Sequence, residues 1–440
     1  MQKKEDLVSK SLKNLGIKTL KEMQEASIRA NDKNDNVILL APTGTGKTLG
    51  FLIPILKRLK PNVKGIQALI ISPSRELSIQ IEQVFRAMKT DYKINAFYGG
   101  HAMKIEKNSL LEPPAVLVGT PGRIAGHIRQ ETFKTSSIKT LVLDEFDKSL
   151  ELGFQEDMRF IIQKIPDVKS KILTSATKSD SIPPFLMMRD PIVLNYIGEI
   201  EMGKLKLRAV RSQGSDKLKA LFNLTCKIGT ESTLIFCNHR EAVDRISELL
   251  KEKELDHDIF HGGLEQHIRE RALIKFRNGS YNILITTDLA SRGLDIPEIK
   301  NIIHYQLPTG KGAYIHRNGR TARMNANGSS YLVLAESEPV PNFIKEEPAF
   351  IDIADEVTLP KAPKWQTLYI SGGKKDKINK IDIVGLMLKK GELNKEDLGL
   401  IEVLDHISYI AVNREKAFKT MMLLKKAKIK KQTVKIAFSR

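Results

Sequence analysis

The stretch from Ala41 to Thr48, Ala-Pro-Thr-Gly-Thr-Gly-Lys-Thr, has the residue types and spacing of a phosphate-binding loop. It follows the apolar run Val37 to Leu40 and precedes an apolar stretch from Leu49, the order of strand, loop and helix. Glycine lets backbone N–H groups turn toward phosphate oxygens, the lysine reaches the β and γ phosphates, and the last threonine holds Mg²⁺. The alternative is a glycine-rich turn with an unrelated Lys-Thr. The predicted nucleotide-binding residues here are Thr43, Gly44, Thr45, Gly46, Lys47 and Thr48.

Asp144 and Glu145 form a pair of carboxylates suited to nucleotide hydrolysis. They follow the apolar run Leu141 to Leu143, so we expect them at the exit of a buried strand next to the strand of the phosphate loop. A carboxylate there holds Mg²⁺ through water, and its neighbour orients and deprotonates the attacking water. We assign Asp144 to the metal and Glu145 to the water; the alternative is a solvated acidic turn.

Two arginines at other strand exits are candidates for contact with nucleic-acid phosphates. Arg75 lies in Pro-Ser-Arg-Glu-Leu and Arg123 in Thr-Pro-Gly-Arg, each after a predicted strand and beside small or hydroxyl residues. Exposed arginines are also common at helix starts, so both interpretations stay open for either residue alone.

Apolar runs alternate with helical patterns around these motifs, which predicts α/β lobes with parallel sheets and ligands at the carboxyl ends of the strands. A second alternation begins near Thr233, after a joint with few apolar runs at 195–214. The predicted strands are 37–40, 68–71, 115–118, 140–143 and 172–173 in the first lobe, and 234–237, 283–285, 302–304 and 331–334 in the second. The predicted domains are a first lobe at 1–207, a second lobe at 208–346, a linker at 347–364 and a third module at 365–440.

The second lobe carries a basic cluster, His316 to Arg323, with four cationic or potentially cationic side chains in eight residues around a glycine. Arginines presented to a γ phosphate from this lobe would neutralise charge that develops in the transition state. The alternative is an exposed basic helix start. Other polar segments lie between and after the second-lobe strands, at 266–269, 286–288 and 291–295.

The chain is basic, with a net charge of +19 and a pI near 9.6, which favours polyanionic partners such as nucleic acid. From 361 to 440 there are 19 basic and 8 acidic residues, so the excess is concentrated in the third module; a solvated lysine-rich surface is the alternative. The two cysteines, Cys226 and Cys237, have no metal-type spacing and suggest a reducing, cytoplasmic setting. We expect neither a secretion signal nor a membrane span.

The third module has the pattern βαββαβ, with strands near 368–370, 400–404, 406–412 and 434–438 and helices near 377–388 and 414–426. This order predicts an α+β fold like that of an RNA-recognition motif, although its aromatic stacking motif is missing. Tyr369 and Tyr409 are the tyrosines placed for base stacking, and either fits a core position equally well.

In the order and content of its motifs, from about Gly16 to Ala335, the chain resembles the DEAD-box RNA helicases. Ser175-Ala176-Thr177 and Gly99-Gly100 complete the set. The resemblance implies two RecA-like lobes that bind ATP with Mg²⁺ and RNA across a cleft. It implies that Gln24 reads adenine, that Ser175, Thr177 and His316 couple the ATP and RNA sites, that Asp295 contacts the ribose, and that Arg320 and Arg323 are the arginine fingers. The residues implied along the RNA backbone are Arg75, Gly100, Thr120, Arg123, Arg269 and Thr287.

The chain departs from the family pattern at several motif positions. Phe146 replaces alanine in Asp-Glu-Phe-Asp, but the acidic positions remain, so we expect catalysis to be kept. Leu20 and Lys21 replace the usual Pro-Thr before Gln24, which puts strict adenine selectivity in question. In the arginine-rich motif Asn318 and Ala322 replace the usual residues.

The third module resembles the C-terminal RNA-binding domain of the DbpA group of bacterial DEAD-box proteins, notably at Thr367 to Ile378 and at Lys428 to Lys430. This implies a monomeric helicase directed to 23S rRNA or pre-50S particles during large-subunit assembly. A cold-shock or general RNA-remodelling helicase, a non-catalytic ATP-gated RNA clamp and a DNA translocase are the alternatives. The candidate RNA contacts in the module are Lys374, Lys375, Lys377, Arg414, Lys428, Lys430 and Lys431.

Overall fold

The computed structural model describes residues 2–100, 103–177, 182–198, 205–290, 299–321, 327–354, 356–430 and 432–439. Two compact units divide the chain. One holds the first lobe, and the other holds the second lobe and the third module. The predicted residues Asp295, Ala322, Arg323 and Lys431 lie outside the described ranges.

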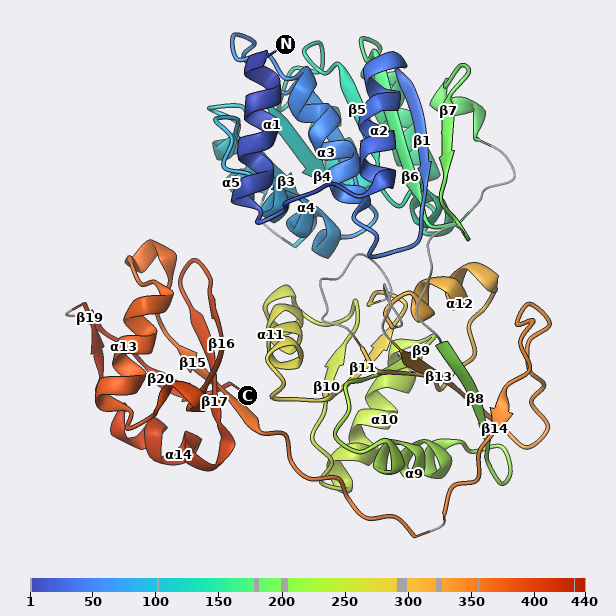
Figure 1. The fold of residues 1–440 in the computed structure, drawn as a ribbon, viewed down its shortest axis with the longest axis vertical. Helices are drawn as coiled ribbons and strands as arrows, with labels where there is room; N and C mark the ends of the chain where they lie inside the picture. The colour runs from blue at the N-terminus through green and yellow to red at the C-terminus, as the bar shows by residue number, and fades with distance from the viewer. Residues whose placement is uncertain are drawn as a thin grey trace. The chain divides into compact units, whose positions relative to one another are not determined.

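The first lobe is a parallel sheet of seven described strands with helices on both faces (Figure 1). Its strands are apolar on both sides: in β2 (Ala68–Ile71), Ala68 and Ile70 face one core cluster, and Leu69 and Ile71 face the other. The first cluster packs against α3 and α4, and the second against α6 and α8. The strand order is β3 (Ile94–Phe97), β4 (Val116–Gly119), β2, β5 (Thr140–Leu143), β6 (Ser170–Ser175), β1 (Asn36–Leu40) and β7 (Ile192–Asn195).

Helices α1 and α2 precede the first strand, and the later helices connect or follow strands; because the strands are parallel, the loops at their carboxyl ends gather at one edge. The helices are α1 (Gln2–Asn14), α2 (Glu22–Lys33), α3 (Lys47–Arg58), α4 (Arg75–Ala87), α5 (Met103–Ser109), α6 (Pro121–Arg129), α7 (Phe146–Glu151), α8 (Gln155–Gln163) and the 3-10 turn η1 (Pro184–Leu186).

The second lobe repeats this architecture with another parallel sheet of seven described strands. The strand order is β10 (Asp258–Phe260), β11 (Ile283–Thr287), β9 (Thr233–Cys237), β12 (Asn301–His304), β13 (Gly328–Leu334), β8 (Leu205–Arg211) and β14 (Ala349–Phe350). Its helices are α9 (Leu218–Ile228), α10 (Arg240–Glu252), α11 (Gln266–Arg277) and α12 (Lys311–Asn318). Both cysteines of the chain are buried and unpaired here, and burial raises the pKa of Cys237 to about 12.

The third module has the predicted βαββαβ order, with an additional short hairpin. Its antiparallel sheet has the order β16 (Leu398–Val403), β17 (Ser408–Asn413), β15 (Trp365–Ile370) and β20 (Ile436–Phe438). The helical elements are η2 (Lys374–Asp376), α13 (Lys380–Lys390), η3 (Lys395–Asp397) and α14 (Arg414–Leu423), and the hairpin is β18 (Lys428–Ile429) with β19 (Gln432–Thr433). The predicted fold class, two RecA-like lobes and a small α+β module, is confirmed. None of the described helices is long and apolar enough to cross a membrane.

Three strands of the second sheet, β8, β14 and β10, were not predicted from the sequence pattern. β8 lies in the region 195–214 that was interpreted as a joint, and the predicted boundary between the two lobes, at 207, falls inside this strand. All of β8 pairs with β13. Because its apolar residues alternate with lysine and arginine, β8 lacks the apolar run that marked the other strands. β14 lies within the predicted linker and pairs with β8.

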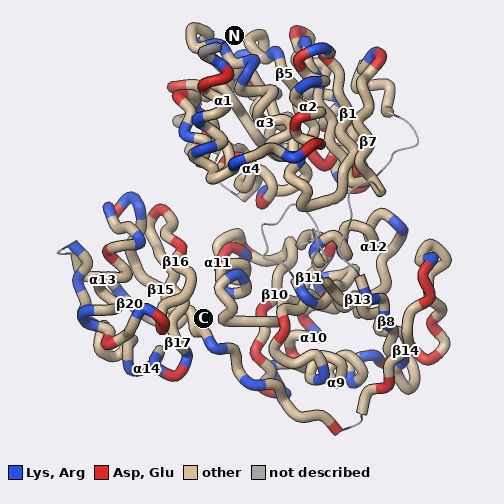
Figure 2. Tube along the Cα trace, viewed as in Figure 1, with Lys and Arg blue, Asp and Glu red and all other residues tan. Residues whose placement is uncertain are grey.

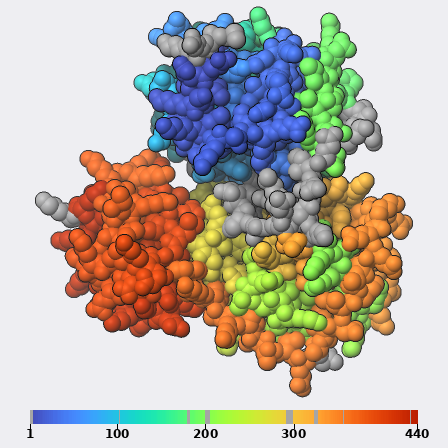
Figure 3. Space-filling view, in the orientation of Figure 1, coloured from blue at the N-terminus to red at the C-terminus, as the bar shows by residue number. Residues whose placement is uncertain are grey.

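Within the second unit, the sheet of the third module packs against the end of α11 and the turn that follows it (Figures 1 and 3). The Asn278 side chain donates to Thr367 Oγ1 at 2.8 Å, and the Thr367 and Ser280 hydroxyls lie 2.7 Å apart. All three side chains are buried. Gly279 has a φ of +75°, and a Cβ on it would lie 3.2 Å from the Trp365 ring, so the turn and the indole are in close contact.

Ion pairs border this contact. Arg277 pairs with Glu402 at 3.1 Å, and Arg414 pairs with Asp256 at 3.1 Å. Arg414 also donates to the carbonyl oxygen of Ser280 at 3.1 Å. Tyr409 is 5% exposed, and the charges of Arg271 and Glu270 act on its hydroxyl, whose pKa is raised mainly by burial. The sheet face of the module, where an RNA-recognition motif conventionally stacks bases, therefore faces the second lobe.

Replacing Thr367 by valine is expected to loosen this packing, because the buried Asn278 and Ser280 side chains would lose their shared partner. The penalty for such buried polar groups is about 1–3 kcal/mol. Amide hydrogen exchange at 278–280 and in β15 should accelerate roughly 5- to 150-fold. Thr433→Val, at an exposed threonine of β19, is the control and should leave exchange at these amides unchanged. Equal exchange in the two variants would contradict the prediction.

Candidate nucleotide site and RNA path

The phosphate loop has the backbone conformation that its glycines allow. Gly44 and Gly46 have φ values of +78° and +95°, and α3 begins at Lys47, so the loop ends at the N-terminus of a helix. The buried Lys47 ammonium donates to the carbonyl oxygens of Ala41 at 2.6 Å and Pro42 at 3.0 Å. These bonds hold the lysine inside the loop.

Gln24, the predicted adenine-reading residue, is tied to this loop. Its amide nitrogen donates to the Gly46 carbonyl at 3.0 Å, and its oxygen accepts from the Lys21 backbone N–H at 3.0 Å. Lys21, which departs from the family pattern, also donates through its ammonium to the Thr45 carbonyl at 3.1 Å. The substituted motif therefore still links the start of α2 to the phosphate loop.

Asp144 and Glu145 follow β5, the strand expected at 140–143, but β5 is not next to the strand of the phosphate loop. β6 lies between β5 and the loop strand β1, so the predicted direct neighbourhood of the two strands is wrong. Thr174 of β6 bridges the gap: its hydroxyl donates to Asp144 Oδ1 and accepts from the Glu145 backbone N–H at 3.2 Å. Glu145 has a φ of +46°, a left-handed conformation that non-glycine residues adopt mainly where function or packing requires it.

Burial raises the pKa of the Asp144 carboxyl above its ordinary value, while the Thr174 hydroxyl and the Lys47 charge oppose this rise. Among the described residues no group of three or more His, Cys, Asp or Glu side chains is arranged to hold a metal. Asp144 and the hydroxyl of Thr48 remain the predicted Mg²⁺ ligands, since Mg²⁺ usually keeps several waters and binds only one or two protein groups.

The remaining acidic-motif residues connect to the segment Ser175–Thr177. Thr177 Oγ1 donates to Asp147 Oδ2 at 2.6 Å, and Ser175 Oγ accepts from the Thr177 N–H at 3.0 Å. Phe146 turns into the hydrophobic core with 4% exposure, so this departure from the family's alanine leaves the carboxylates at the sheet edge.

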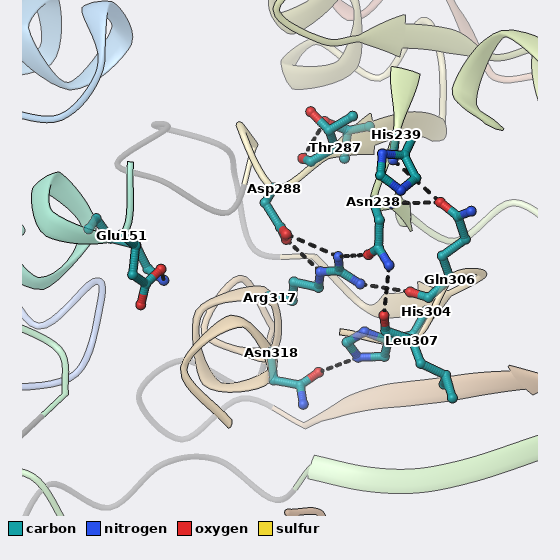
Figure 4. A network of polar contacts seen from close by, with 12 residues as sticks. Glu151, Asn238, His239, Thr287, Asp288, His304, Gln306, Leu307, Arg317 and Asn318 are labelled. Atoms are coloured by element: carbon teal, nitrogen blue, oxygen red, sulfur yellow. Dashed lines mark hydrogen bonds and ion pairs between the residues drawn. The ribbon is translucent and has the colours of Figure 1, made fainter. Parts of the chain in front are cut away.

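In the second lobe the fully buried Arg317 joins the exits of three strands (Figure 4). Its guanidinium pairs with Asp288 at 2.5 and 3.1 Å, and donates to Asn238 Oδ1 at 2.7 Å and to the Gln306 carbonyl at 2.8 Å. These partners follow β11, β9 and β12. Such a buried, paired guanidinium holds α12 in one position relative to the sheet.

Asn318, another departure from the family pattern, has partners of its own. Its Oδ1 lies 3.2 Å from His304 Nε2 and accepts from the Ser330 hydroxyl at 2.9 Å. Burial, followed by the charge of Arg317, lowers the pKa of His304 to about 3, so this imidazole is neutral. His316 and Arg320 are buried at 0% and 3% exposure on and just after α12, which Arg317 positions.

The predicted RNA-path residues of the first lobe lie at the exits of β2, β3 and β4. Arg75 begins α4 with its guanidinium beside Gly99 and Gly100; a Cβ on Gly100 would lie 2.6 Å from Arg75 Nη1. Thr120 is the N-cap residue of α6, and Arg123 is one turn into that helix. In the second lobe Arg269 is buried on α11 and Thr287 ends β11, so the predicted RNA-path residues are divided between the two lobes.

The third-module candidates differ in their surroundings. Arg414 contacts the second lobe, Lys375 pairs with Asp405 at 2.9 Å, and Lys430 pairs with Asp382 at 2.8 Å. Lys374 and Lys377 lie exposed at η2 and Lys428 lies exposed in β18. Figure 2 shows basic residues along α13, α14 and the segment that precedes the module.

Sequence reasoning did not single out Asn238, Asp288, Gln306 or Arg317 as positioning residues. Asp288 and Arg317 stood within quoted motifs, but nothing in the sequence indicated that they pair. A polar residue after a predicted strand is the signal that was available: Asn238 directly follows 234–237, and Asp288 comes three residues after 283–285.

Three family models match the chain: DEAD/DEAH box helicase at residues 21–183, Helicase conserved C-terminal domain at 216–325, and DbpA RNA binding domain at 367–437. The ATP-dependent RNA helicase eIF4A of Mycosarcoma maydis is 38% identical over 67% of this chain and 74% of its own length. The chain belongs to the DEAD-box ATP-dependent RNA helicases. It is of the DbpA type, since the ATP-dependent RNA helicase DbpA of Escherichia coli is 29% identical over 97% of this chain and 96% of its own length.

The solved structure of S. cerevisiae Dbp5 bound to RNA and ADP BeF3 superposes with a TM-score of 0.68 and 26% identity, covering 78% of this chain and 92% of that one. The recognition of the family, the RecA-like fold and the enzyme class from sequence are thereby confirmed. As a DEAD-box helicase the protein uses ATP and binds RNA.

Replacing Thr174 by valine is expected to move the acid limb of the helicase's ATPase pH profile to higher pH. The hydroxyl lowers the pKa of Asp144, so its removal leaves the rise caused by burial less opposed. The charged carboxylate is present above that pKa and is lost as pH falls through it. A hydrogen bond to a charged group contributes about 1.5–3 kcal/mol, which corresponds to about one to two pH units.

The measurement is kcat/KM for ATP against pH at saturating RNA. Thr140→Val, at the opposite end of β5, is the control and should keep the wild-type acid limb. An unshifted limb in Thr174→Val would contradict the role of this hydroxyl.

Proposed function

We propose that this DEAD-box helicase hydrolyses ATP with Mg²⁺ at the Asp144–Glu145 edge of the first lobe and locally unwinds RNA in 23S rRNA or pre-50S particles. The observation that carries the catalytic part is the Thr174 bridge, which holds both carboxyl-bearing residues at the carboxyl edge of β5, next to β6 and the phosphate loop. The DbpA RNA binding domain match supports the targeting part.

In this proposal Lys47 and the loop residues from Thr43 to Thr48 bind the phosphates. Asp144 and Thr48 hold Mg²⁺, partly through water, and the ion neutralises phosphate charge. Glu145 orients and deprotonates the attacking water, since its left-handed backbone presents the carboxylate at the strand exit. Gln24 reads adenine and Asp295 contacts the ribose.

Arg320 and Arg323 are proposed as arginine fingers that neutralise charge on the γ phosphate. Ser175, Thr177 and His316 couple hydrolysis to RNA, and the hydrogen bond from Thr177 to Asp147 supplies one physical link. Because ATP and RNA both favour the closed arrangement of the lobes, each promotes binding of the other by the same factor. Loss of the γ phosphate then releases RNA.

Glu145→Gln tests the catalytic assignment. The amide keeps the size of the side chain but cannot accept the proton, so RNA-stimulated turnover is expected to fall about 10²- to 10⁴-fold. ATP affinity should stay close to that of the wild type, as measured with a fluorescent nucleotide. Lys47→Ala is the comparison, because it should weaken nucleotide binding itself. Unchanged turnover in Glu145→Gln would show that another group activates the water.

The targeting proposal predicts that a 23S fragment containing the peptidyl-transferase-centre hairpin stimulates ATP turnover at a much lower concentration than a homopolymer does. Both are measured at one moderate salt concentration, because phosphate contacts are salt-dependent. Neutralising the exposed lysines of η2 and β18 in Lys374→Gln/Lys377→Gln/Lys428→Gln should remove this advantage.

The charge-matched control is Lys389→Gln/Lys390→Gln/Lys395→Gln, at exposed lysines around the end of α13. It should keep the preference for the 23S fragment. Equal stimulation by all RNAs in the wild type would favour a general RNA-remodelling role over large-subunit assembly. We further propose that the protein acts as a monomer in the cytoplasm. The two buried free thiols support the cytoplasmic location, because disulfides are rare in that reducing compartment.

A further inference from the structure

Glu106 is an almost fully buried carboxylate on α5, a helix outside the motifs considered so far, with 6% exposure. Its Oε1 accepts from the Tyr98 backbone N–H at 3.2 Å. Its Oε2 accepts from Arg123 Nε at 2.6 Å and lies 2.7 Å from His127 Nε2. One side chain thus contacts the exit of β3 and two residues of α6, the helix that follows β4.

The segments joined by Glu106 are those that carry the proposed RNA path of the first lobe. Tyr98 directly precedes Gly99 and Gly100, against which the Arg75 guanidinium lies. Arg123 and His127 belong to α6, and Thr120 occupies the N-cap position of that helix. Because β3, β4 and β2 are adjacent strands, the segments at their carboxyl ends are neighbours, but no strand ladder connects them beyond the sheet.

The carboxylate is itself held rigidly. The ring of His127 is fully buried and stacks on Phe97 with 4.7 Å between centroids. Its other nitrogen, Nδ1, lies 2.8 Å from the Thr132 hydroxyl. Because this rigid carboxylate accepts from Arg123 Nε, it limits rotation of the Arg123 guanidinium and sets the direction of the guanidinium plane.

We propose that Glu106 is a positioning residue for RNA binding, which orients Arg123 toward the RNA backbone and ties the α6 segment to the Gly99–Gly100 turn. The inference rests on the proposed function of Arg123 in the RNA path. If the Glu106 carboxylate acted only through its charge, it would repel RNA phosphates, and neutralising it would strengthen RNA binding. If it positions Arg123, neutralising it would weaken RNA binding.

The test compares full-length wild type with Glu106→Gln in RNA-stimulated ATP turnover, using a single-stranded homopolymer RNA. Positioning predicts that KM for RNA rises about three- to tenfold, the equivalent of one hydrogen bond, while kcat at saturating RNA stays close to the wild-type value. If Glu106 had only a structural role, Glu106→Gln would lower the melting temperature without raising KM for RNA at an unchanged kcat. A lower KM, or an unchanged one, would overturn the proposal.

Glu106→Asp is the second variant, because it keeps the charge but withdraws the carboxylate by one methylene. It should raise KM for RNA in the same way, and a wild-type KM in this variant would also overturn the proposal. Glu112→Gln, at an exposed carboxylate shortly after α5, is the control and should leave KM unchanged.

Arg123→Gln separates this inference from the proposed function. If Arg123→Gln does not raise KM for RNA, the assignment of Arg123 to the RNA path fails. If Arg123→Gln raises KM for RNA but Glu106→Gln does not, only the positioning role of Glu106 fails. When Glu106→Gln is added to Arg123→Gln, KM should rise no further, because the residue that Glu106 orients is already absent.

Discussion

In both lobes, a buried polar side chain joins loops that the backbone cannot join. Parallel strands share hydrogen bonds along their length, but beyond their carboxyl ends the loops diverge and no ladder aligns them. Thr174 bridges to Asp144 and Glu145 in the first lobe, and Arg317 connects Asp288, Asn238 and Gln306 in the second. The geometry of a site built at such an edge depends on these bridges.

The departures from the family pattern are absorbed by the surrounding structure in physically different ways. Phe146 adds an apolar ring to the core, so its extra volume does not reach the carboxylates. Lys21 replaces a hydroxyl residue with a longer donor that reaches the phosphate loop. Asn318 is buried and bonded to His304 and Ser330, which satisfies a polar group that burial would otherwise penalise. Each of these side chains is thus either packed in the core or hydrogen-bonded to its surroundings.

The contact between the third module and the second lobe changes how the module is understood. From sequence alone the segment 347–364 was a linker, and Tyr369 and Tyr409 were open to either base stacking or core packing. Instead β14 extends the second sheet, and Thr367, Trp365 and Tyr409 face the α11 side of the second lobe. In this arrangement Thr367 and Tyr409 of the sheet are buried, whereas Lys374, Lys377 and Lys428 stay exposed.

The motifs made of neighbouring residues were predictable from sequence: the phosphate loop, the acidic pair, the strands with continuous apolar runs and the βαββαβ order of the third module. In each of these, chemistry and conformation depend on residues within a few positions of one another. The alternating strand β8 was not predictable in this way, because its partner β13 lies more than a hundred residues away and supplies the hydrogen bonds that make it a strand. The same limit applies to the insertion of β6 between β1 and β5, the pairing of Arg317 with Asp288, the tie from Glu106 to Arg123 and the bond from Asn278 to Thr367. These contacts join residues far apart in the chain, so they depend on which strands and modules pack together, and local residue patterns do not encode that.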